Sequence, residues 1–557
     1  MFNTATALVV LLVSSLLLFL LTHDTVVIIN LSVWEMSKLD IRITMYLDFI
    51  ASRFLITVLL ISLAVRFFSA YYLQGILNSR QFHITLGVFV LSIIILITRP
   101  NLISLMIGWD GLGISSYLLV IFYKRRKSLN AGLLTGISNR VGDGLILVAL
   151  AGFSRAPFLT LPVMRNTGSG FRGATIFILA VAACTKSAQI PFRAWLPAAI
   201  AAPTPVSALV HSSTLVTAGI YLLLRVSNRI PHFYSAVLAN LGGVTILLAS
   251  LRALKETDGK KIVALSTLSQ LGVIMTGLSF NRPRIVFFHL LVHAFFKALL
   301  FIRTGFLIHN FNNYQNLRVM GGSIKWATTN TAVIIATKAR LSGLPFFAAF
   351  YSKEVLLESL GRGARGLVLV YIWILVGVIL TLLYSARFVF LTRFNYARVE
   401  VRGFSRAKSL VLLTRVLVLY LPRVVGGKYL LLYLSQYIIL PIISTIMKFS
   451  TFLLIFRALI LYKTYRDVTY SFLKFYRFIW ALPLVAGRVP AKVLGSIGIG
   501  LFKRIIFSIR DFYWFIWRKP VSNSKNLLIA SPRGNLSVRL RYFIVLSISA
   551  VLFLHRV

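Results

Sequence analysis

Three titratable side chains recur at intervals of four residues in one apolar segment. They are His289, His293 and Lys297. In a helix this spacing places all three on one face, in a line roughly 12 Å long. Histidine titrates near neutral pH, and a lysine shielded from water can release its proton, so the pattern predicts a proton relay. The two histidines also have the spacing of a zinc pair, but the glutamate of the zincin signature and a third ligand are missing, so we expect no metal site.

A second group of ionisable residues interrupts the preceding apolar runs. Asp110 follows Trp109, and Arg140 and Asp143 lie in the next run. A charged carboxylate at membrane depth costs about 2.5 to 3.5 kcal/mol, so something must compensate for it. Because Arg140 and Asp143 are three residues apart, they share one helix face, and Arg140 can pair with Asp143, with Asp110 or with both. A purely structural ion pair is the alternative.

Two lysines lie beside prolines. Lys186 ends an apolar run shortly before Pro191. Desolvation favours a neutral lysine and a nearby carboxylate favours the charged form, so a lysine and aspartate pair can load and unload a proton near neutral pH. The alternative is a lysine whose ammonium reaches the membrane interface. Lys353 and Glu354 form a similar ionisable pair after Pro345, with an interfacial salt bridge as the alternative.

A single imidazole lies in an apolar stretch that is rich in hydroxyl groups. His211 is followed by Ser212, Ser213, Thr214 and Thr217. An imidazole, hydroxyls and trapped water can form a chain for proton transfer. A buried, hydrogen-bonded histidine without a transport role is the alternative. Further along, Lys260 and Lys261 stand at the expected start of a helix, where Lys261 can equally be a surface anchor.

Membrane-spanning helices must position these residues. The chain has 557 residues, is 58% hydrophobic and has a mean hydropathy of +0.85, which places it in a bilayer. Apolar runs of spanning length recur from Thr4–Leu21 to Tyr542–Leu554 and predict an all-α polytopic fold of roughly 14 to 16 transmembrane helices. The first run lacks the basic segment and cleavage site of a secretory signal, so we expect a retained helix.

The sequence predicts one membrane domain with five segments. Residues 1–100 are expected to hold about three peripheral transmembrane helices, separated by the polar stretch His23–Tyr46 and by a loop near Gln74–Gln81. Residues 101–391 carry nearly all ionisable residues inside apolar runs and are the predicted proton-translocation core. Residues 392–462 add transmembrane helices, 463–537 form a basic amphipathic lateral helix region, and 538–557 form a C-terminal transmembrane anchor.

Proline and lysine occur together in two parts of the core, Thr185–Pro205 and Ser342–Glu358. Proline lacks a backbone donor and interrupts a helix. Paired interrupted helices in two repeats build the midplane ion sites of many transporters. A two-repeat transport architecture is therefore our hypothesis.

Charge and cysteine content exclude several kinds of partner and cofactor site. Sixty Lys and Arg residues against 13 Asp and Glu residues give a formal net charge of +47. Because the basic residues flank apolar helices, they indicate anionic lipid and acidic partner subunits, with no nucleic acid. Cys184 is the only cysteine, so the chain alone can hold neither an iron–sulfur cluster nor an internal disulfide. The segment Gly168–Gly173 matches the dinucleotide glycine pattern, but without a preceding strand or an acidic residue about 20 positions on, so we expect no cofactor in this chain.

Several of these segments together resemble a known family. Three segments carry the resemblance. The first runs from Thr185-Lys186-Ser187-Ala188-Gln189-Ile190-Pro191 through Ala202-Pro203-Thr204-Pro205 to His211 and Gly219, and the others are Phe288–Leu300 and Gly343–Glu354. They resemble the subunit 5 family of mitochondrial NADH:ubiquinone oxidoreductase, respiratory complex I. More distantly they are similar to the large Mrp-type cation/proton antiporter subunits. The resemblance covers about Gly108 to Glu358.

The resemblance implies inverted five-helix repeats with broken helices, and a lateral helix before a last anchor. Asp110 would be the acidic partner of Lys186, with Arg140 and Asp143 nearby. A connecting axis would comprise His211, Lys260, His289, His293 and Lys297, and Lys353 with Glu354 would form the distal exit. Proton pumping would be driven by NADH oxidation and quinone reduction in other subunits, in the mitochondrial inner membrane. Neighbouring antiporter-like and other complex I membrane subunits, and anionic lipid such as cardiolipin, would be the partners.

The chain also departs from the family pattern. Many relatives have glutamate at Asp110, and Arg303, Lys338 and Arg340 stand where uncharged residues are expected.

Two other functions are compatible with the residues. One is a Mrp-type secondary antiporter subunit, and the other is a non-transporting structural membrane subunit.

Overall fold

The computed structural model describes residues 26–36, 39–75, 78–153, 170–227, 230–323, 328–343, 348–363 and 368–393. All of them belong to one compact unit, Met1–Thr469. The expected first helix, nearly all of segment 392–462, the lateral helix at 463–537 and the anchor at 538–557 lie outside the described residues.

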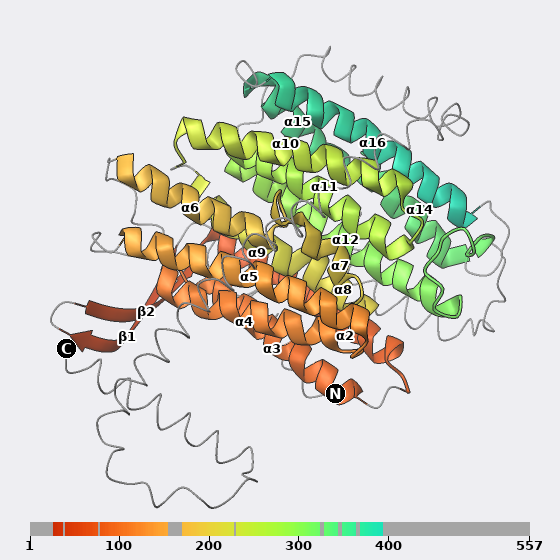
Figure 1. The fold of residues 1–557 in the computed structure, drawn as a ribbon, viewed down its shortest axis with the longest axis horizontal. Helices are drawn as coiled ribbons and strands as arrows, with labels where there is room; N and C mark the ends of the chain where they lie inside the picture. The colour runs from red at the N-terminus through yellow and green to blue at the C-terminus, as the bar shows by residue number, and fades with distance from the viewer. Residues whose placement is uncertain are drawn as a thin grey trace, which may run out of the picture. The chain divides into compact units, whose positions relative to one another are not determined.

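The described chain begins with a hairpin of two strands, β1 (Val27–Met36) and β2 (Leu39–Leu47). The helices that follow are α2 (Phe49–Tyr72), α3 (Ser79–Thr98), α4 (Leu102–Ile121), α5 (Arg126–Phe153), α6 (Gly170–Lys186), the 3-10 helix η2 (Phe192–Ala194), α7 (Trp195–Ala199), α8 (Thr204–Leu209), the π-helical turn η3 (Val210–Thr214), α9 (Leu215–Val226), α10 (His232–Lys255), α11 (Gly259–Ser279), α12 (Pro283–Asn310), α14 (Thr328–Ser342), α15 (Ala348–Gly363) and α16 (Val368–Arg393). Figure 1 shows these helices running alongside one another.

Membrane-spanning helices dominate the described chain. Nine segments are long and apolar enough to cross a membrane, counting α8, η3 and α9 as the single span Thr204–Val226. Each helix pairs its own backbone groups, which is what a segment in hydrocarbon requires. The prediction of a multi-span helical membrane protein is confirmed, and its total of roughly 14 to 16 spans also includes segments outside the described residues.

A two-stranded hairpin adds to the predicted helical fold at the start of the described chain. Its strands are antiparallel, with Val27 opposite Leu47 and Ile29 opposite Met45, and the register shifts between Ser32 and Trp34. The sequence predicted only a polar connection at His23–Tyr46. Val27 and Ile29 are β-branched and favour a strand, and the run is too short to span a membrane as a helix. The helical reading of residues 1–100 therefore missed the two strands.

Helix α12 lies at the centre of the described bundle. It packs against α2, α8, α11, α14 and α15. The spanning segments of α12 and of α8–α9 are completely buried, and α11 is nearly so. By contrast α3, α4, α5, α10 and α16 are half-buried or less and expose apolar residues, such as Ile84 and Val88 on α3. Helix α12, α11 and the α8–α9 span are therefore inside, whereas α4 and α5, which carry Asp110, Arg140 and Asp143, are among the outer helices of the described bundle.

The helical path is interrupted beside both proline-associated lysines. Helix α6 ends at Lys186. Only the short helices η2 and α7 lie between α6 and α8, because Pro191 and Pro203 interrupt the helix there. Helix α14 ends at Ser342, Gly343 adopts φ +83°, and α15 begins at Ala348. A positive φ at the residue after a helix is a common glycine stop signal. The inverted relation between the two repeats stays a prediction.

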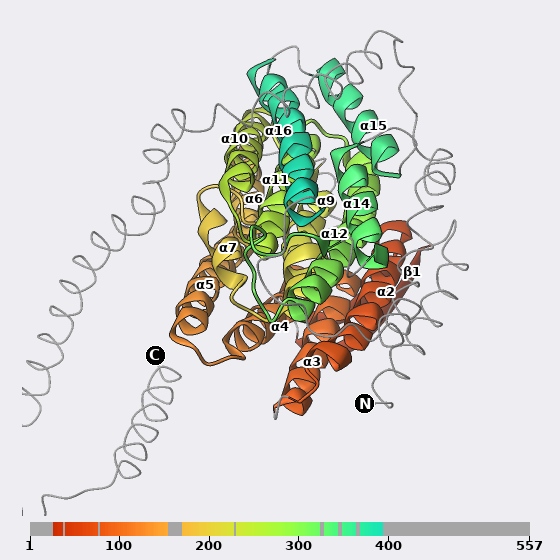
Figure 2. The same cartoon turned by 90° about the vertical axis from the view of Figure 1, so that its right-hand side faces the viewer.

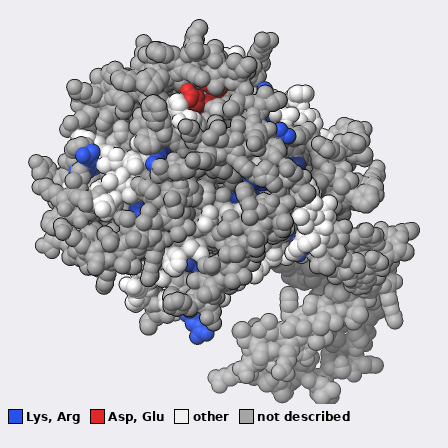
Figure 3. Space-filling model, turned by 180° about the vertical axis from the view of Figure 1, so that it is seen from behind, with Lys and Arg blue, Asp and Glu red and all other residues white. Residues whose placement is uncertain are grey.

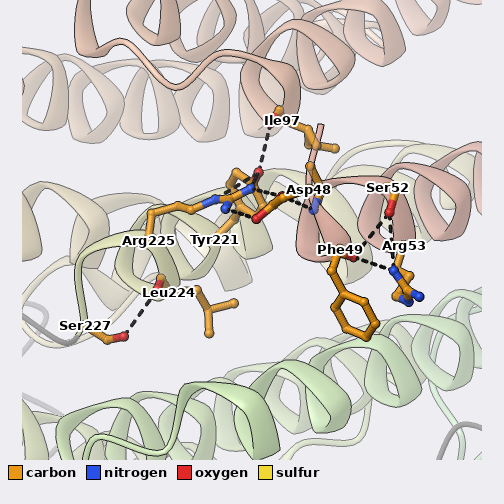
Figure 4. A network of polar contacts seen from close by, with 10 residues as sticks. Asp48, Phe49, Ser52, Arg53, Ile97, Tyr221, Leu224, Arg225 and Ser227 are labelled. Atoms are coloured by element: carbon orange, nitrogen blue, oxygen red, sulfur yellow. Dashed lines mark hydrogen bonds and ion pairs between the residues drawn. The ribbon is translucent and has the colours of Figure 1, made fainter. Parts of the chain in front are cut away.

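An ion pair joins the start of α2 to the end of α9 (Figure 4). Arg225 donates to both carboxylate oxygens of Asp48, over 2.6 and 2.8 Å, and also to the Tyr221 hydroxyl. That hydroxyl donates in turn to the Ile97 carbonyl on α3. Asp48 also caps α2 by accepting from the Ala51 amide. This group, Asp48, Arg225, Tyr221 and Ile97, is called the α2–α9 clamp below.

Candidate functional site

The Lys186 ammonium is fully buried at the end of α6. Its Nζ donates to the Trp109 carbonyl oxygen on α4 over 2.6 Å and lies 3.9 Å from the centroid of the Trp109 ring. Close packing fixes this end of α6. A Cβ on Gly219 of α9 would collide with the Ala183 carbonyl, and one on Gly142 of α5 would collide with Thr185. Two glycines therefore let neighbouring helices approach the lysine closely.

The carboxylates lie on α4 and α5 beside this lysine. Arg140 Nη1 is 2.9 Å from Asp143 Oδ2 and 3.8 Å from Asp110 Oδ1, which confirms that Arg140 pairs with both. Neither aspartate forms an ion pair with Lys186. Their charges still act on its ammonium through space. The expected partnership of Asp110 and Lys186 is therefore indirect in this structure, with the Trp109 carbonyl and ring in direct contact instead.

His211 lies in the π-helical turn η3 and is connected to the Lys186 region by Trp195. The Trp195 Nε1 donates to the Thr185 carbonyl over 2.9 Å, and its ring centroid lies 6.0 Å from that of His211. Neither nitrogen of the buried His211 ring hydrogen-bonds to a described residue. Single π-helical turns inside α-helices often occur at functional sites. The hydroxyl of Ser212, next in the chain, bonds back to the Ala208 carbonyl.

The three residues on α12 lie on one buried face, as their spacing predicted. The His289 Nδ1 is 3.0 Å from the Ser352 hydroxyl of α15, and the rings of His289 and His293 are 6.3 Å apart between centroids. The Lys297 ammonium donates to the Ser266 hydroxyl of α11 over 2.6 Å. The two ends of this line, His289 and Lys297, are thus joined to hydroxyls on two neighbouring helices, while neither nitrogen of His293 hydrogen-bonds to a described residue.

The remaining predicted residues are buried or half-buried but are not all brought together. Lys353 on α15 donates to the Thr381 hydroxyl of α16 over 3.2 Å and forms no ion pair with the half-buried Glu354. Lys260 is buried near the start of α11. Its neighbour Lys261 pairs with Asp258 over 2.9 Å, with 41% of its side chain exposed, as suits an anchor.

Residues 100–383 match the family described as NADH:quinone oxidoreductase/Mrp antiporter, transmembrane. That match covers half of the chain and contains every predicted site residue. The chain belongs to this family.

Relatives and a solved structure agree with the family assignment. The chain is 46% identical over 356 residues to NADH-ubiquinone oxidoreductase chain 5 of Anopheles quadrimaculatus, covering 62% of this chain and 61% of the relative. It is 46% identical over 355 residues to the protein of that name in Anopheles arabiensis, covering 62% and 92%. The Mrp complex from Dietzia sp. DQ12-45-1b aligns with a TM-score of 0.75 at 23% identity, covering 99% of this chain and 63% of that one, which shows a shared fold.

Sequence reasoning missed the uncharged partners within this antiporter-family site. Trp109 and Trp195 contact or flank the Lys186 region, while Ser266, Ser352 and Thr381 hydrogen-bond to the titratable residues. Hydroxyl groups inside apolar helices were a usable signal, because a hydroxyl in hydrocarbon needs a partner. Which hydroxyl meets which lysine depends on helix packing and could not be deduced from spacing.

Proposed function

We propose that this chain is a proton-translocating core membrane subunit of mitochondrial respiratory complex I, NADH:ubiquinone oxidoreductase. It would be part of an enzyme whose redox centres belong to other subunits, and it would carry no cofactor itself. Its location would be the mitochondrial inner membrane. Family membership and relatives that bear the name of this oxidoreductase support the assignment.

The buried face of α12 carries the proposal. His289, His293 and Lys297 are each at most 3% exposed, and hydroxyls of Ser266 and Ser352 meet its two ends. A structural role would call for matching carboxylates, because a buried charge without a partner is costly. No ion pair joins these three residues to a described carboxylate. Exchangeable protons on an amine and two imidazoles, with a hydroxyl at each end of the line, suit conduction better.

Lys186 is suited to load and release the proton in the energy-driven step of translocation. It has one set of partners in the Trp109 carbonyl and ring, and a second set within electrostatic reach in Asp110 and Asp143. A desolvated cation–π contact is worth about 2 kcal/mol. Moving a proton against 100 mV requires about 2.3 kcal/mol. Exchange between the two sets of partners can therefore change the proton affinity of Lys186 by an amount of the required size, while NADH oxidation in other subunits would supply the energy.

Partner membrane subunits are part of the proposal. On α4 and α5, 59% of the Arg140 side chain and 38% of the Asp110 side chain are exposed on the described bundle. Charges facing hydrocarbon cost about 2.5 to 3.5 kcal/mol each, so a neighbouring complex I subunit, such as an antiporter-like one, would cover them. Anionic lipid such as cardiolipin is the second partner. On the face shown in Figure 3, basic side chains of the described residues are visible at several separate places.

A Mrp-type secondary antiporter subunit is the second candidate, supported by the shared fold with the Dietzia Mrp complex. The two functions differ in their driving force, which is NADH oxidation for complex I and an ion gradient for an antiporter. A non-transporting structural subunit is the third candidate. It would tolerate neutral replacement of the buried lysines.

The test measures NADH-driven proton pumping and NADH:quinone electron transfer in reconstituted intact complex. Lys186→Met and Lys353→Met are the test variants, and Lys261→Met is the matched control because Lys261 is half exposed and paired with Asp258. We expect pumping per electron to fall in both test variants and to persist in the control. Normal pumping in assembled Lys186→Met and Lys353→Met complexes would favour the structural candidate. Pumping driven by an imposed Na⁺ gradient without NADH would favour the antiporter.

A further inference from the structure

Lys338 is a buried lysine outside the predicted relay. It lies on α14, is 1% exposed, and its ammonium makes no hydrogen bond to a described residue. The Nζ lies 4.0 Å from the Phe388 ring centroid and 5.9 Å from the Tyr384 ring centroid, both on α16. Aromatic faces stabilise a cation but accept no proton from it through a conventional hydrogen bond. The amine is therefore held in place without a fixed proton acceptor.

Lys353 contacts the face of α16 that also faces Lys338. Thr381, which binds the Lys353 ammonium, lies seven residues before Phe388, which faces the Lys338 ammonium. Seven residues correspond to about 10 Å along a helix, and Tyr384 lies between them on that face. The end of α14 also reaches Lys353, because a Cβ on Gly343 would be 3.6 Å from the Lys353 Cδ. The two lysines are thus neighbours along one stripe.

The charges around Lys338 do not neutralise it. Helix α14 packs against α12, α15 and α16. Their buried charged and titratable residues include His293, Lys297, Arg303, Lys353, Glu358 and Tyr384, and Arg340 is buried on α14 itself. Lys338 and Lys353 both act on Lys297 as like charges. No ion pair joins Lys297, Lys338 or Lys353 to a described carboxylate. Buried like charges disfavour one another, so the three amines compete for protons.

We propose that Lys338 is a further proton-carrying residue of this site, exchanging a proton with Lys297 and Lys353 and extending the route along α16. In each exchange an N–H bond of one ammonium breaks, and the neutral amine of another lysine gains that proton through an intervening hydroxyl or water. The inference rests on the proposed function. The alternative is a purely structural role, in which the cation–π contact of Lys338 with Phe388 only holds α14 against α16.

Three substitutions separate these roles in the intact complex in proteoliposomes. Lys338→Met cannot carry a proton, Lys338→Arg keeps the charge and the cation–π contact but cannot release its proton, and Lys338→His can exchange one. We expect Met and Arg to reduce NADH-driven pumping about tenfold, equivalent to about 1.4 kcal/mol on the limiting transfer. We expect His to retain most of the pumping. Native electrophoresis checks assembly, and Lys338→Gln replaces any variant that does not assemble.

Wild-type pumping by assembled Lys338→Arg, or by the neutral Met or Gln variant, would overturn the inference. Loss of pumping in Lys338→His together with retention in Lys338→Arg would identify the purely structural role and overturn the inference as well. Lys186→Met and Lys353→Met are measured in parallel. If they lose pumping while Lys338→Arg does not, only this inference fails. If they also pump normally, the proposed function fails.

Discussion

At the scale of single residues, the Lys186 site depends on a tryptophan more directly than on a carboxylate. The Trp109 carbonyl accepts from the ammonium and the Trp109 ring lies under it, while Arg140 engages both nearby aspartates. Any substitution at this position keeps the carbonyl, because the carbonyl belongs to the backbone. The contribution of the ring can therefore be measured by itself.

Trp109→Leu should impair proton translocation more than Trp109→Phe does. Leucine removes the aromatic face beside Lys186, whereas phenylalanine keeps a weaker one. Loss of about 1 to 2 kcal/mol of ammonium stabilisation would slow the step that needs a charged Lys186 roughly tenfold. The measurement is pumped protons per electron in reconstituted complex. Equal pumping by the leucine and phenylalanine variants would show that the ring only fills space.

Residue spacing predicted some of this site and could not predict the rest. The face of His289, His293 and Lys297 follows from helix geometry, and the pairing of Arg140 with Asp143 follows from a three-residue interval. Lys186 and Trp109 are 77 positions apart in the chain. Such a contact depends on how α6 approaches α4, which local periodicity does not encode. Indirect coupling between Asp110 and Lys186 was missed for the same reason.

At the scale of elements, apolar runs predicted the helices well, because each spanning helix must be long and hydrophobic in its own right. The β1–β2 hairpin was missed, since the polar residues of His23–Tyr46 predict a connection between helices. The α2–α9 clamp was also missed. Asp48 and Arg225 are 177 positions apart, and Arg225 is one of 60 basic residues, so the sequence does not indicate which of them pairs with Asp48.

The clamp leads to a prediction about stability. The side chains of Asp48 and Arg225 are only 15% and 14% exposed. Asp48→Ala would leave the Arg225 charge buried without its carboxylate, and breaking a buried pair costs about 3 to 5 kcal/mol. The double variant Asp48→Ala with Arg225→Met removes both charges and should be less destabilised than Asp48→Ala alone. Release of this chain from the purified complex during a temperature ramp, followed by native electrophoresis, measures the difference.

A matched control comes from an ion pair that is more exposed than the clamp. Arg252 and Glu256 are one turn apart on and just after α10, and their side chains are 30% and 21% exposed. Glu256→Ala should lower stability by less than about 1 kcal/mol, as for other partly solvated pairs. If Asp48→Ala were no more destabilising than Glu256→Ala, the clamp would not hold α2 to α9.

At the scale of the whole molecule, the charge imbalance calls for partners. Sixty Lys and Arg residues outnumber the 13 carboxylates of the chain and leave a formal net charge of +47 to be balanced by other molecules. Each Lys or Arg near an anionic bilayer surface contributes about 1 kcal/mol of attraction, which salt screens. Raising the ionic strength from roughly 0.01 M to 1 M shortens the Debye length from about 30 Å to about 3 Å. Lipid contacts made by exposed basic side chains should therefore depend strongly on salt.

Photoactivatable cardiolipin should label this chain several-fold more than photoactivatable phosphatidylcholine does when the intact complex is reconstituted at low salt. The excess should shrink as salt is raised, because the attraction acts through solvent-exposed charges. Peptide mapping by mass spectrometry measures both effects, and labelling of the buried segment Pro283–Asn310 gives the background, since lipid does not reach it. Equal labelling by the two lipids at low salt would mean that acidic partner subunits, and not anionic lipid, balance the positive charge.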